Sequence, residues 1–125
     1  MRLPSLDSIL LASTDPARLR DWYAAALDPE ENADVDGYLV LKFGHFHLLI
    51  DSRADISDKN PEPGRMVLNF DVADARAVVA RFETLGVSWL TELEDRHGSL
   101  FATAIDPDGN YVQIIELSEE HRAAM

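Results

Sequence analysis

The sequence contains no cysteine, which excludes disulfide bonds, thiolate metal ligands and thiol nucleophiles. Long apolar runs are also missing. The run at 9–12 near the N-terminus is too short for the apolar core of a signal peptide. No stretch approaches the roughly 20 apolar residues that cross a bilayer. We therefore expect a cytoplasmic protein without a membrane segment.

Basic residues are few: 11 lysines and arginines stand against 23 aspartates and glutamates, for a formal net charge of −12. Such a charge repels phosphate backbones, so a nucleic-acid partner is not expected. The same charge either attracts a cationic small molecule or simply keeps the protein in solution. The sequence also has no nucleophile elbow, P-loop, G-x-G-x-x-G or H-E-x-x-H motif.

The 125 residues fit one domain, and 46% hydrophobic residues can build a core that needs no metal or disulfide. A polar segment at 53–65 contains Pro61, Pro63 and Gly64, a composition typical of a linker. It separates two modules of similar length, at about 6–52 and about 66–118.

The two modules repeat the same pattern. Each begins with an apolar strand, at 8–13 and 67–72, followed by an aspartate suited to cap a helix, Asp15 and Asp74. A shift of about 59 residues, the separation of these aspartates, also places Tyr23 on Phe82 within matching helical stripes. The matching helix caps, the matching alternation of the strands and the matching apolar positions of the helices together indicate a duplicated unit.

Further strands are expected after each helix. In the first module they lie at 38–43 and 45–50, and a less clear strand lies at 32–35. In the second module they lie at 87–93, 99–105 and 111–117. The segment Asp106-Pro107-Asp108-Gly109-Asn110 predicts a tight hairpin turn before the last strand. The fold class is therefore α+β: two βαβββ modules forming a curved mixed sheet around a cavity, with the helices on the outer face.

The stretch DPDGNYVQIIEL (106–117) resembles the last hairpin and strand of the vicinal-oxygen-chelate superfamily. The spacing of Asp15 to Tyr23 in DPARLRDWY, repeated from Asp74 to Phe82, agrees with it. This superfamily includes glyoxalase I, bleomycin-resistance proteins, fosfomycin-resistance enzymes and extradiol dioxygenases. The resemblance covers about residues 6–118. It implies a homodimer and, in the enzymes, a divalent metal held by histidine and glutamate from four strands.

The resemblance places those four ligand positions at Ser8, Val67 and Gln113 and near His47 or Leu48. Ser8 and Val67 are poor metal ligands, and Gln113 offers only a neutral oxygen. Glu116 is not a replacement, because strand alternation turns it to the opposite face from Gln113. We therefore expect no cofactor and no family-type metal centre. The weak metal candidates are His45, His47 and Gln113: the two histidines either share a strand face and begin a displaced site, or are exposed near a turn.

Strand alternation turns Asn69, Tyr111 and Gln113 toward the cavity. Trp89 either lines the cavity or packs in the core. The predicted ligand-binding residues are Ser8, His47, Val67, Asn69, Trp89, Tyr111 and Gln113, which would suit a partly aromatic, polar small molecule.

The remaining titratable groups carry weaker signals. Glu92 and Glu94 share a predicted strand face, as an acid/base pair or as solvated side chains. The pair Glu30 and Glu31 is expected in a loop. His97 is expected in an exposed loop, and His121 in the C-terminal tail shows no functional pattern. No residue is singled out as catalytic.

Three functions remain open. The main hypothesis is a small-molecule-binding protein that lacks the usual metal. The second is a metal-dependent lyase, isomerase or dioxygenase with a displaced site near His47. The third is sequestration of a cationic drug, suggested by the net charge of −12.

Overall fold

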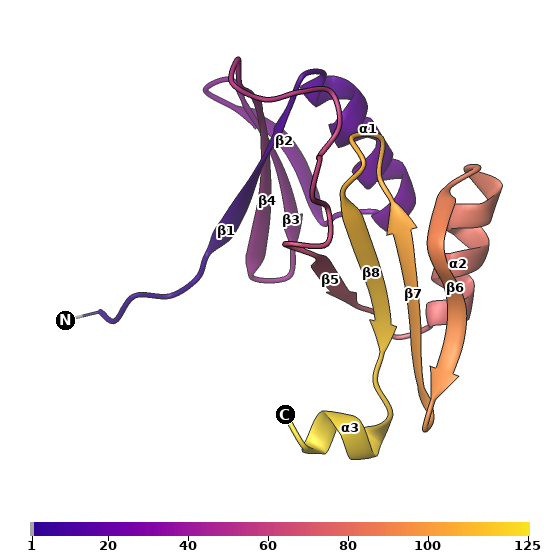
Figure 1. Ribbon diagram of the computed structural model, residues 1–125. Helices are drawn as coiled ribbons and strands as arrows, with labels where there is room; N and C mark the ends of the chain where they lie inside the picture. Colours follow the sequence, from indigo (N-terminus) through magenta and orange to yellow (C-terminus); the bar gives the residue numbers. More distant parts are fainter. Residues whose placement is uncertain (1) are drawn as a thin grey trace. The chain divides into compact units, whose positions relative to one another are not determined.

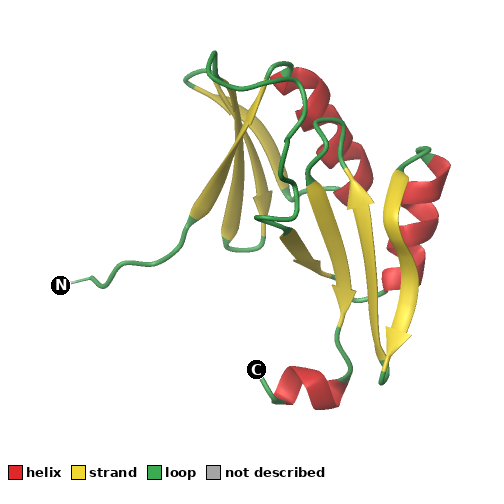
Figure 2. Ribbon diagram, in the orientation of Figure 1, coloured by secondary structure: helices red, strands yellow, loops and turns green. Residues whose placement is uncertain are grey.

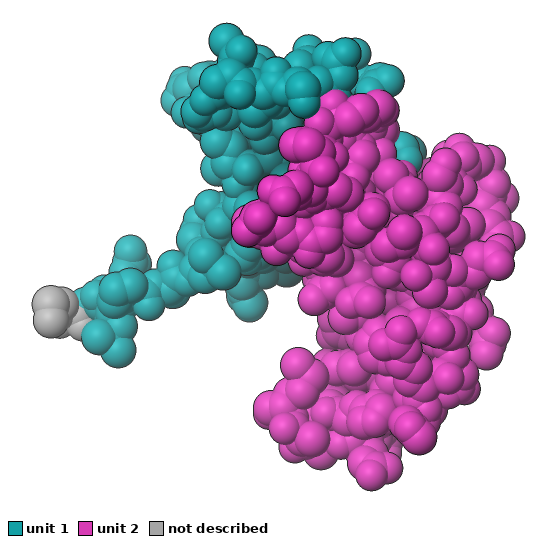
Figure 3. Space-filling view, viewed as in Figure 1, with its two compact units in different colours: residues 1–58 teal, residues 59–125 magenta. Residues whose placement is uncertain are grey.

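The computed structural model describes residues 2–125, and the chain divides into two compact units, residues 1–58 and 59–125 (Figure 3). Each unit contains one four-stranded mixed sheet with a long helix against one face (Figures 1 and 2). The predicted α+β class and the duplicated βαβββ module are thereby confirmed.

Unit 1 contains one helix and four strands. They are β1 (Ser8–Ser13), α1 (Pro16–Leu27), β2 (Glu31–Val35), β3 (Tyr38–Phe43) and β4 (Phe46–Ser52). Its sheet, called sheet 1, has the order β1-β4-β3-β2, with β1 parallel to β4 and the other pairs antiparallel. The second strand, the least clear in the sequence, is present and begins at Glu31, so the prediction of a loop at Glu31 is wrong.

Unit 2 repeats this plan. It contains β5 (Leu68–Asp71), α2 (Ala75–Thr84), β6 (Ser88–Arg96), β7 (Ser99–Ile105), β8 (Tyr111–Glu116) and α3 (Glu119–Ala123). Its sheet, called sheet 2, has the order β5-β8-β7-β6, again with the first and last strands parallel. The short helix α3 has no counterpart in unit 1 and was not predicted.

Both long helices begin at the predicted aspartates. The Asp15 carboxylate accepts a hydrogen bond from the Arg18 N–H at 3.3 Å, and the Asp74 carboxylate accepts one from the Ala77 N–H at 3.1 Å. Each bond satisfies a backbone donor that the first turn of a helix leaves without a partner. Gly86, just after the end of α2, has a φ of +71°, the left-handed geometry that favours glycine there.

The core of each unit lies between its sheet and its long helix. In unit 1, Leu19 and Tyr23 of α1 are fully buried together with apolar side chains of the sheet, Leu41, Leu48 and Ile50. In unit 2, Phe82 of α2 is buried with Ala102, Ala104, Val112 and Ile114. Full burial of each such large side chain contributes about 1.5–3 kcal/mol. Because strand side chains alternate, each sheet also has a second face, opposite its helix, which we call the far face.

Two hairpins share one local design. The turns Asp36-Gly37 and His97-Gly98 both use two residues with positive φ, the geometry that joins twisted strands with a two-residue loop. In each, an aspartate two residues before the turn accepts a hydrogen bond from the glycine N–H, Asp34 at 3.1 Å and Asp95 at 2.8 Å. The duplication therefore extends to the side chains that fix these turns. His97 is exposed, as predicted.

Within residues 2–125, none of the helices has the length and apolar character needed to cross a bilayer.

Candidate functional site on the far face of sheet 2

A row of neutral polar side chains crosses all four strands of sheet 2. Asn69 on β5 is in register with Gln113 on β8, Gln113 with Thr103 on β7, and Thr103 with Thr91 on β6. We call these four residues the polar row. Neighbouring strands are about 4.8 Å apart, so the row extends over about 14 Å. Each side chain can both donate and accept a hydrogen bond without carrying charge.

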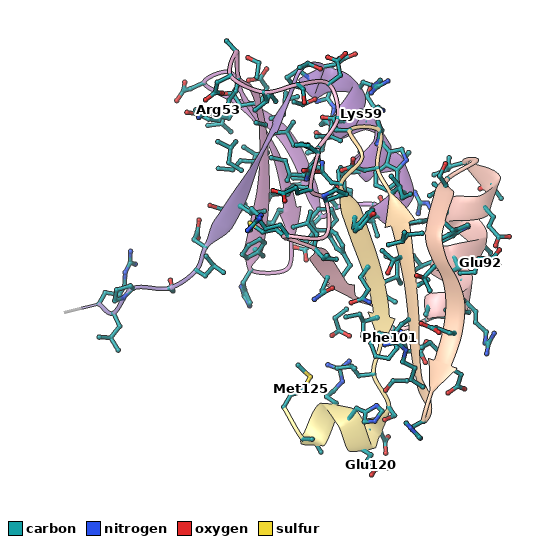
Figure 4. The ribbon with its side chains drawn as sticks, viewed as in Figure 1. Arg53, Lys59, Glu92, Phe101, Glu120 and Met125 are labelled. Carbon is teal, nitrogen blue, oxygen red and sulfur yellow. The ribbon has the colours of Figure 1, made fainter. Side chains whose placement is uncertain are left out.

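Apolar side chains border the polar row along the strands. On one side, Tyr111 is in register with Ile105; on the other, Ile115 is in register with Phe101. These residues lie two positions from the row, so alternation places them on the same face. Figure 4 labels Phe101 on β7. The far face of sheet 2 therefore offers a hydrogen-bonding strip between two apolar borders.

Two carboxylates stand on this face, and each is paired with an arginine. Arg122 of α3 donates two hydrogen bonds to Asp71, Nη2 to Oδ1 at 2.7 Å and Nη1 to Oδ2 at 3.1 Å. These hydrogen bonds, with the charge of the guanidinium, hold the pKa of Asp71 below its ordinary value. Glu94 forms an ion pair with Arg96, whose guanidinium carbon lies 5.1 Å from the centre of the Phe101 ring.

The helix α3 is anchored to sheet 2 by a second set of contacts. The buried Ser99 hydroxyl of β7 is hydrogen-bonded to Nδ1 of His121 and accepts a hydrogen bond from the Ser118 N–H at 2.8 Å. The Ser118 hydroxyl in turn accepts from the His121 N–H at 3.1 Å. His121, for which the sequence shows no functional pattern, thus has a structural role: it fixes α3 to the strand. Sequence spacing gave no sign of this, because Ser99 and His121 meet only once β7 and β8 have paired.

The turn before β8 is the predicted tight hairpin. The buried Asp106 carboxylate accepts hydrogen bonds from the N–H groups of Asp108 and Asn110, both at 2.9 Å. The segment before β5 is bound to this turn: Asn60 donates its N–H to the Asp108 carbonyl at 2.8 Å and its side-chain amide to Asn110 Oδ1 at 2.9 Å. Lys59 Nζ donates to the Pro107 carbonyl.

This strapped segment reaches the aromatic border of the polar row. Gly64 passes beside the Tyr111 ring, and a Cβ at this glycine would be in ordinary van der Waals contact with Cε2 of the ring, at 3.9 Å. Tyr111 is half-buried. Segment 59–64 and α3 therefore lie at opposite ends of the far face of sheet 2.

Two other predicted residues lie on the helix-covered face. The Trp89 ring stacks on Phe82 of α2, with centroids 5.7 Å apart, so Trp89 packs in the core and does not line the far face. Glu116 accepts a hydrogen bond from the Ala75 N–H at 2.8 Å, which confirms that it points away from Gln113. Bulges in β6 between Trp89 and Thr91 and between Thr91 and Glu94 break the alternation on which the pairing of Glu92 with Glu94 depended.

Three of the remaining predicted residues, Ser8, His45 and His47, lie in unit 1. Ser8 on β1 is the register partner of His47 on β4, and His47 is next to Lys42 on β3. His45 is exposed in the turn before β4, as the second alternative expected, so the two histidines do not share a strand. Val67 of unit 2, which precedes β5, is 38% exposed.

The residues present do not fit the metal that the fold family implies. At the expected ligand positions, His47 is the one strong donor, beside Ser8, Val67 and Gln113. Across the described part of the chain, no three histidine, aspartate or glutamate side chains gather in a way that could hold a metal ion.

The sequence of this chain matches the Glyoxalase/Bleomycin resistance protein/Dioxygenase superfamily over residues 5–114, and the chain belongs to that superfamily. A comparison with curated proteins finds no match.

Solved structures of the same fold include TnmS3, an antibiotic binding protein from Streptomyces sp. CB03234. It is 20% identical, with a TM-score of 0.69, and the match covers 94% of this chain and 99% of that one. TioX from Micromonospora sp. ML1 is 18% identical, with a TM-score of 0.67 and coverage of 90% and 98%. The oxidase ChaP-H2 is 16% identical, with a TM-score of 0.75 and coverage of 94% and 96%. At these identities, the likeness establishes the shared fold.

Proposed function

We propose that this protein binds an organic small molecule on the far face of sheet 2, without a family-type metal centre. The polar row between two apolar borders carries the proposal, because binding sites combine apolar contact area with a few placed hydrogen-bonding groups. The fold likeness to an antibiotic binding protein supports it. Asn69, Gln113 and Tyr111 are the proposed contact residues in unit 2. Ser8 and His47, which are register partners of each other in unit 1, are proposed for the same function.

A fragment screen by two-dimensional NMR tests the location. Binders are expected to shift the side-chain amide signals of Asn69 and Gln113. Gln113→Ala is expected to lower the affinity of these fragments at least about fivefold. Asn32→Ala is the matched control, because Asn32 is an exposed strand asparagine of unit 1 outside the proposed site. Fragments that shift other residues while leaving Asn69 and Gln113 unchanged would overturn the proposal.

Elemental analysis of protein purified without chelators tests the metal part. We expect no stoichiometric zinc, nickel, manganese or iron, and no rise in melting temperature when these ions are added. The competing function, a metal-dependent lyase, isomerase or dioxygenase near His47, requires both. A thermal shift that disappears in His47→Ala would establish that alternative.

We also propose, from the family resemblance, that the protein is a homodimer, and from its lack of cysteine, that it works in the cytoplasm. Light scattering after size-exclusion chromatography is expected to give twice the chain mass of 14.0 kDa. A single-chain mass at the concentrations at which fragments bind would overturn the dimer.

A further inference from the structure

We infer that the ligand of this face is an uncharged, planar hydrogen-bonding molecule of about three fused rings, although the chain carries a net charge of −12. This inference rests on the proposed function and specifies its ligand. The polar row supplies only amides and hydroxyls, which recognise neutral donors and acceptors.

The charges on the far face of sheet 2 balance locally. Asp71 is held by two hydrogen bonds from Arg122, and Glu94 is paired with Arg96. The strands thus bring Asp71, Glu94 and Arg96 to this face and α3 brings Arg122, so each carboxylate has its own partner. A site for a cation would present a carboxylate that is left for the ligand to pair. The excess negative charge must therefore lie elsewhere on the chain. Salt largely screens the effect of exposed charges that are more than about 8–10 Å from the bound ligand.

The dimensions of the face set the size of the ligand. The polar row crosses four strands and so extends over about 14 Å. Tyr111 and Phe101 on its two sides offer aromatic contact to a flat molecule. A planar molecule of about three fused rings that lies across the strands would reach most of the row while its faces and edges meet the apolar borders.

Three fluorescent tricyclic probes of different charge allow a direct test, and the cation among them also lacks the N–H donor and carbonyl acceptor of acridone. They are acridone, which is neutral and has one donor and one acceptor, 10-methylacridinium, a cation, and acridone-4-carboxylate, an anion. We expect acridone to bind at least about tenfold more tightly than either charged probe. Its affinity should change less than about twofold between low salt and about 0.3 M sodium chloride. Tighter binding of the cation, a steep loss of acridone affinity with salt, or no acridone binding at about 1 mM would overturn the inference.

Removing one arginine should change the preference in a predictable direction. Arg122→Ala leaves the Asp71 carboxylate without its partner, so the ratio of 10-methylacridinium affinity to acridone affinity should rise about fivefold at low salt. Arg53→Ala is the matched control: Arg53 makes an equivalent two-bond pair with Asp55 in unit 1, at 2.9 and 2.7 Å. It lowers the net charge by the same amount and should leave the ratio unchanged. Equal effects of the two variants would show that overall charge, and not this face, decides the preference.

A neutral replacement of the pair separates charge from the anchoring of α3. Asp71→Asn combined with Arg122→Gln removes both charges, and the affinity ratio should stay at the wild-type value. A raised ratio in the double variant would assign the effect to movement of α3 and overturn the electrostatic argument. If Gln113→Ala abolishes binding but the cation is preferred, the inference fails and the proposed function stands. If probes bind and Gln113→Ala has no effect, the proposed function itself fails.

Discussion

The Glu116 carboxylate of β8 accepts a hydrogen bond from the backbone N–H of Ala75 at 2.8 Å, and so caps the first turn of α2 from outside the helix. Asp74 caps the same turn through the Ala77 N–H. Together they satisfy two of the four donors that a helix N-terminus leaves open. The negative charge of Glu116 also lies at the positive end of the helix. The Glu116 carboxylate, three residues after Gln113, is therefore engaged in holding the helix to its sheet.

Glu116→Ala should lower the free energy of unfolding by about 1–2 kcal/mol, because the Ala75 N–H loses its acceptor. Glu116→Gln should recover part of this loss, since the amide oxygen can still accept. Urea unfolding followed by circular dichroism measures both. Glu120→Gln on the exposed side of α3 (Figure 4) is the control and should change stability by less than about 0.5 kcal/mol. Equal stability of Glu116→Ala and the wild type would contradict the capping role.

The fold was predictable because its signals are local and repeated. The strands at 8–13, 38–43, 99–105 and 111–116 and the two aspartate caps follow from alternation and capping chemistry alone. The weakest prediction, β2, has one further local signal: Asp36-Gly37 is a favoured pair for a two-residue hairpin turn, and it indicates a strand directly before it.

The site was predictable only in part, because register decides it. Alternation placed Asn69 and Gln113 on one face, but their pairing with Thr103 and Thr91 requires the strand order and the bulges of β6. No spacing in the sequence reveals that Arg122 pairs with Asp71 or His121 with Ser99. These contacts join residues far apart in the chain. In addition, α3 is too short to show a helical repeat of apolar residues in the sequence.

The stack of Trp89 on the fully buried Phe82 predicts a stability effect and an optical one. Phe82→Ala should cost about 3–5 kcal/mol, the range for deleting a buried aromatic ring, and Phe82→Leu should cost less. In a Trp22→Phe background, the emission of Trp89 should shift to longer wavelength in Phe82→Leu, because the ring loses its apolar cover. An unshifted spectrum would mean that Trp89 does not pack on α2 in solution.

The contacts of Ser99 predict a local effect on α3. Ser99→Ala removes the acceptor of the Ser118 N–H and the partner of His121 at once. Amide hydrogen exchange over 118–123 should accelerate about tenfold, while the exchange of the β7 and β8 amides stays as in the wild type. His97→Asn is the control, because His97 is exposed in a turn and asparagine tolerates its positive φ of 55°. Unchanged exchange in Ser99→Ala would show that α3 is anchored by other means.

The pairing of Asp71 with Arg122 predicts how the docking of α3 depends on pH. The hydrogen bonds from Arg122 lower the pKa of Asp71 in the folded protein below the unfolded value of about 3.9. A lowered folded-state pKa means that the contribution to stability is fully present above the unfolded pKa. It is lost as the pH falls through the lower folded-state value. The contribution of this pair to the docking of α3 should therefore be constant from about pH 7 to about pH 5, and should decrease only below about pH 4.

Carbon-13 NMR of the Asp71 carboxyl group measures this pKa directly. Its titration midpoint should lie below the usual aspartate value in the wild type, and Arg122→Ala should return it to about 3.9. Arg53→Ala should leave the Asp71 midpoint unchanged, because that arginine pairs with Asp55. Because both groups of the Asp71 pair are largely exposed, added salt should reduce the difference between the wild type and Arg122→Ala. A midpoint that is ordinary in the wild type and insensitive to Arg122→Ala would show that the pair is not formed in solution. It would also remove the local charge balance from which the neutral ligand was inferred.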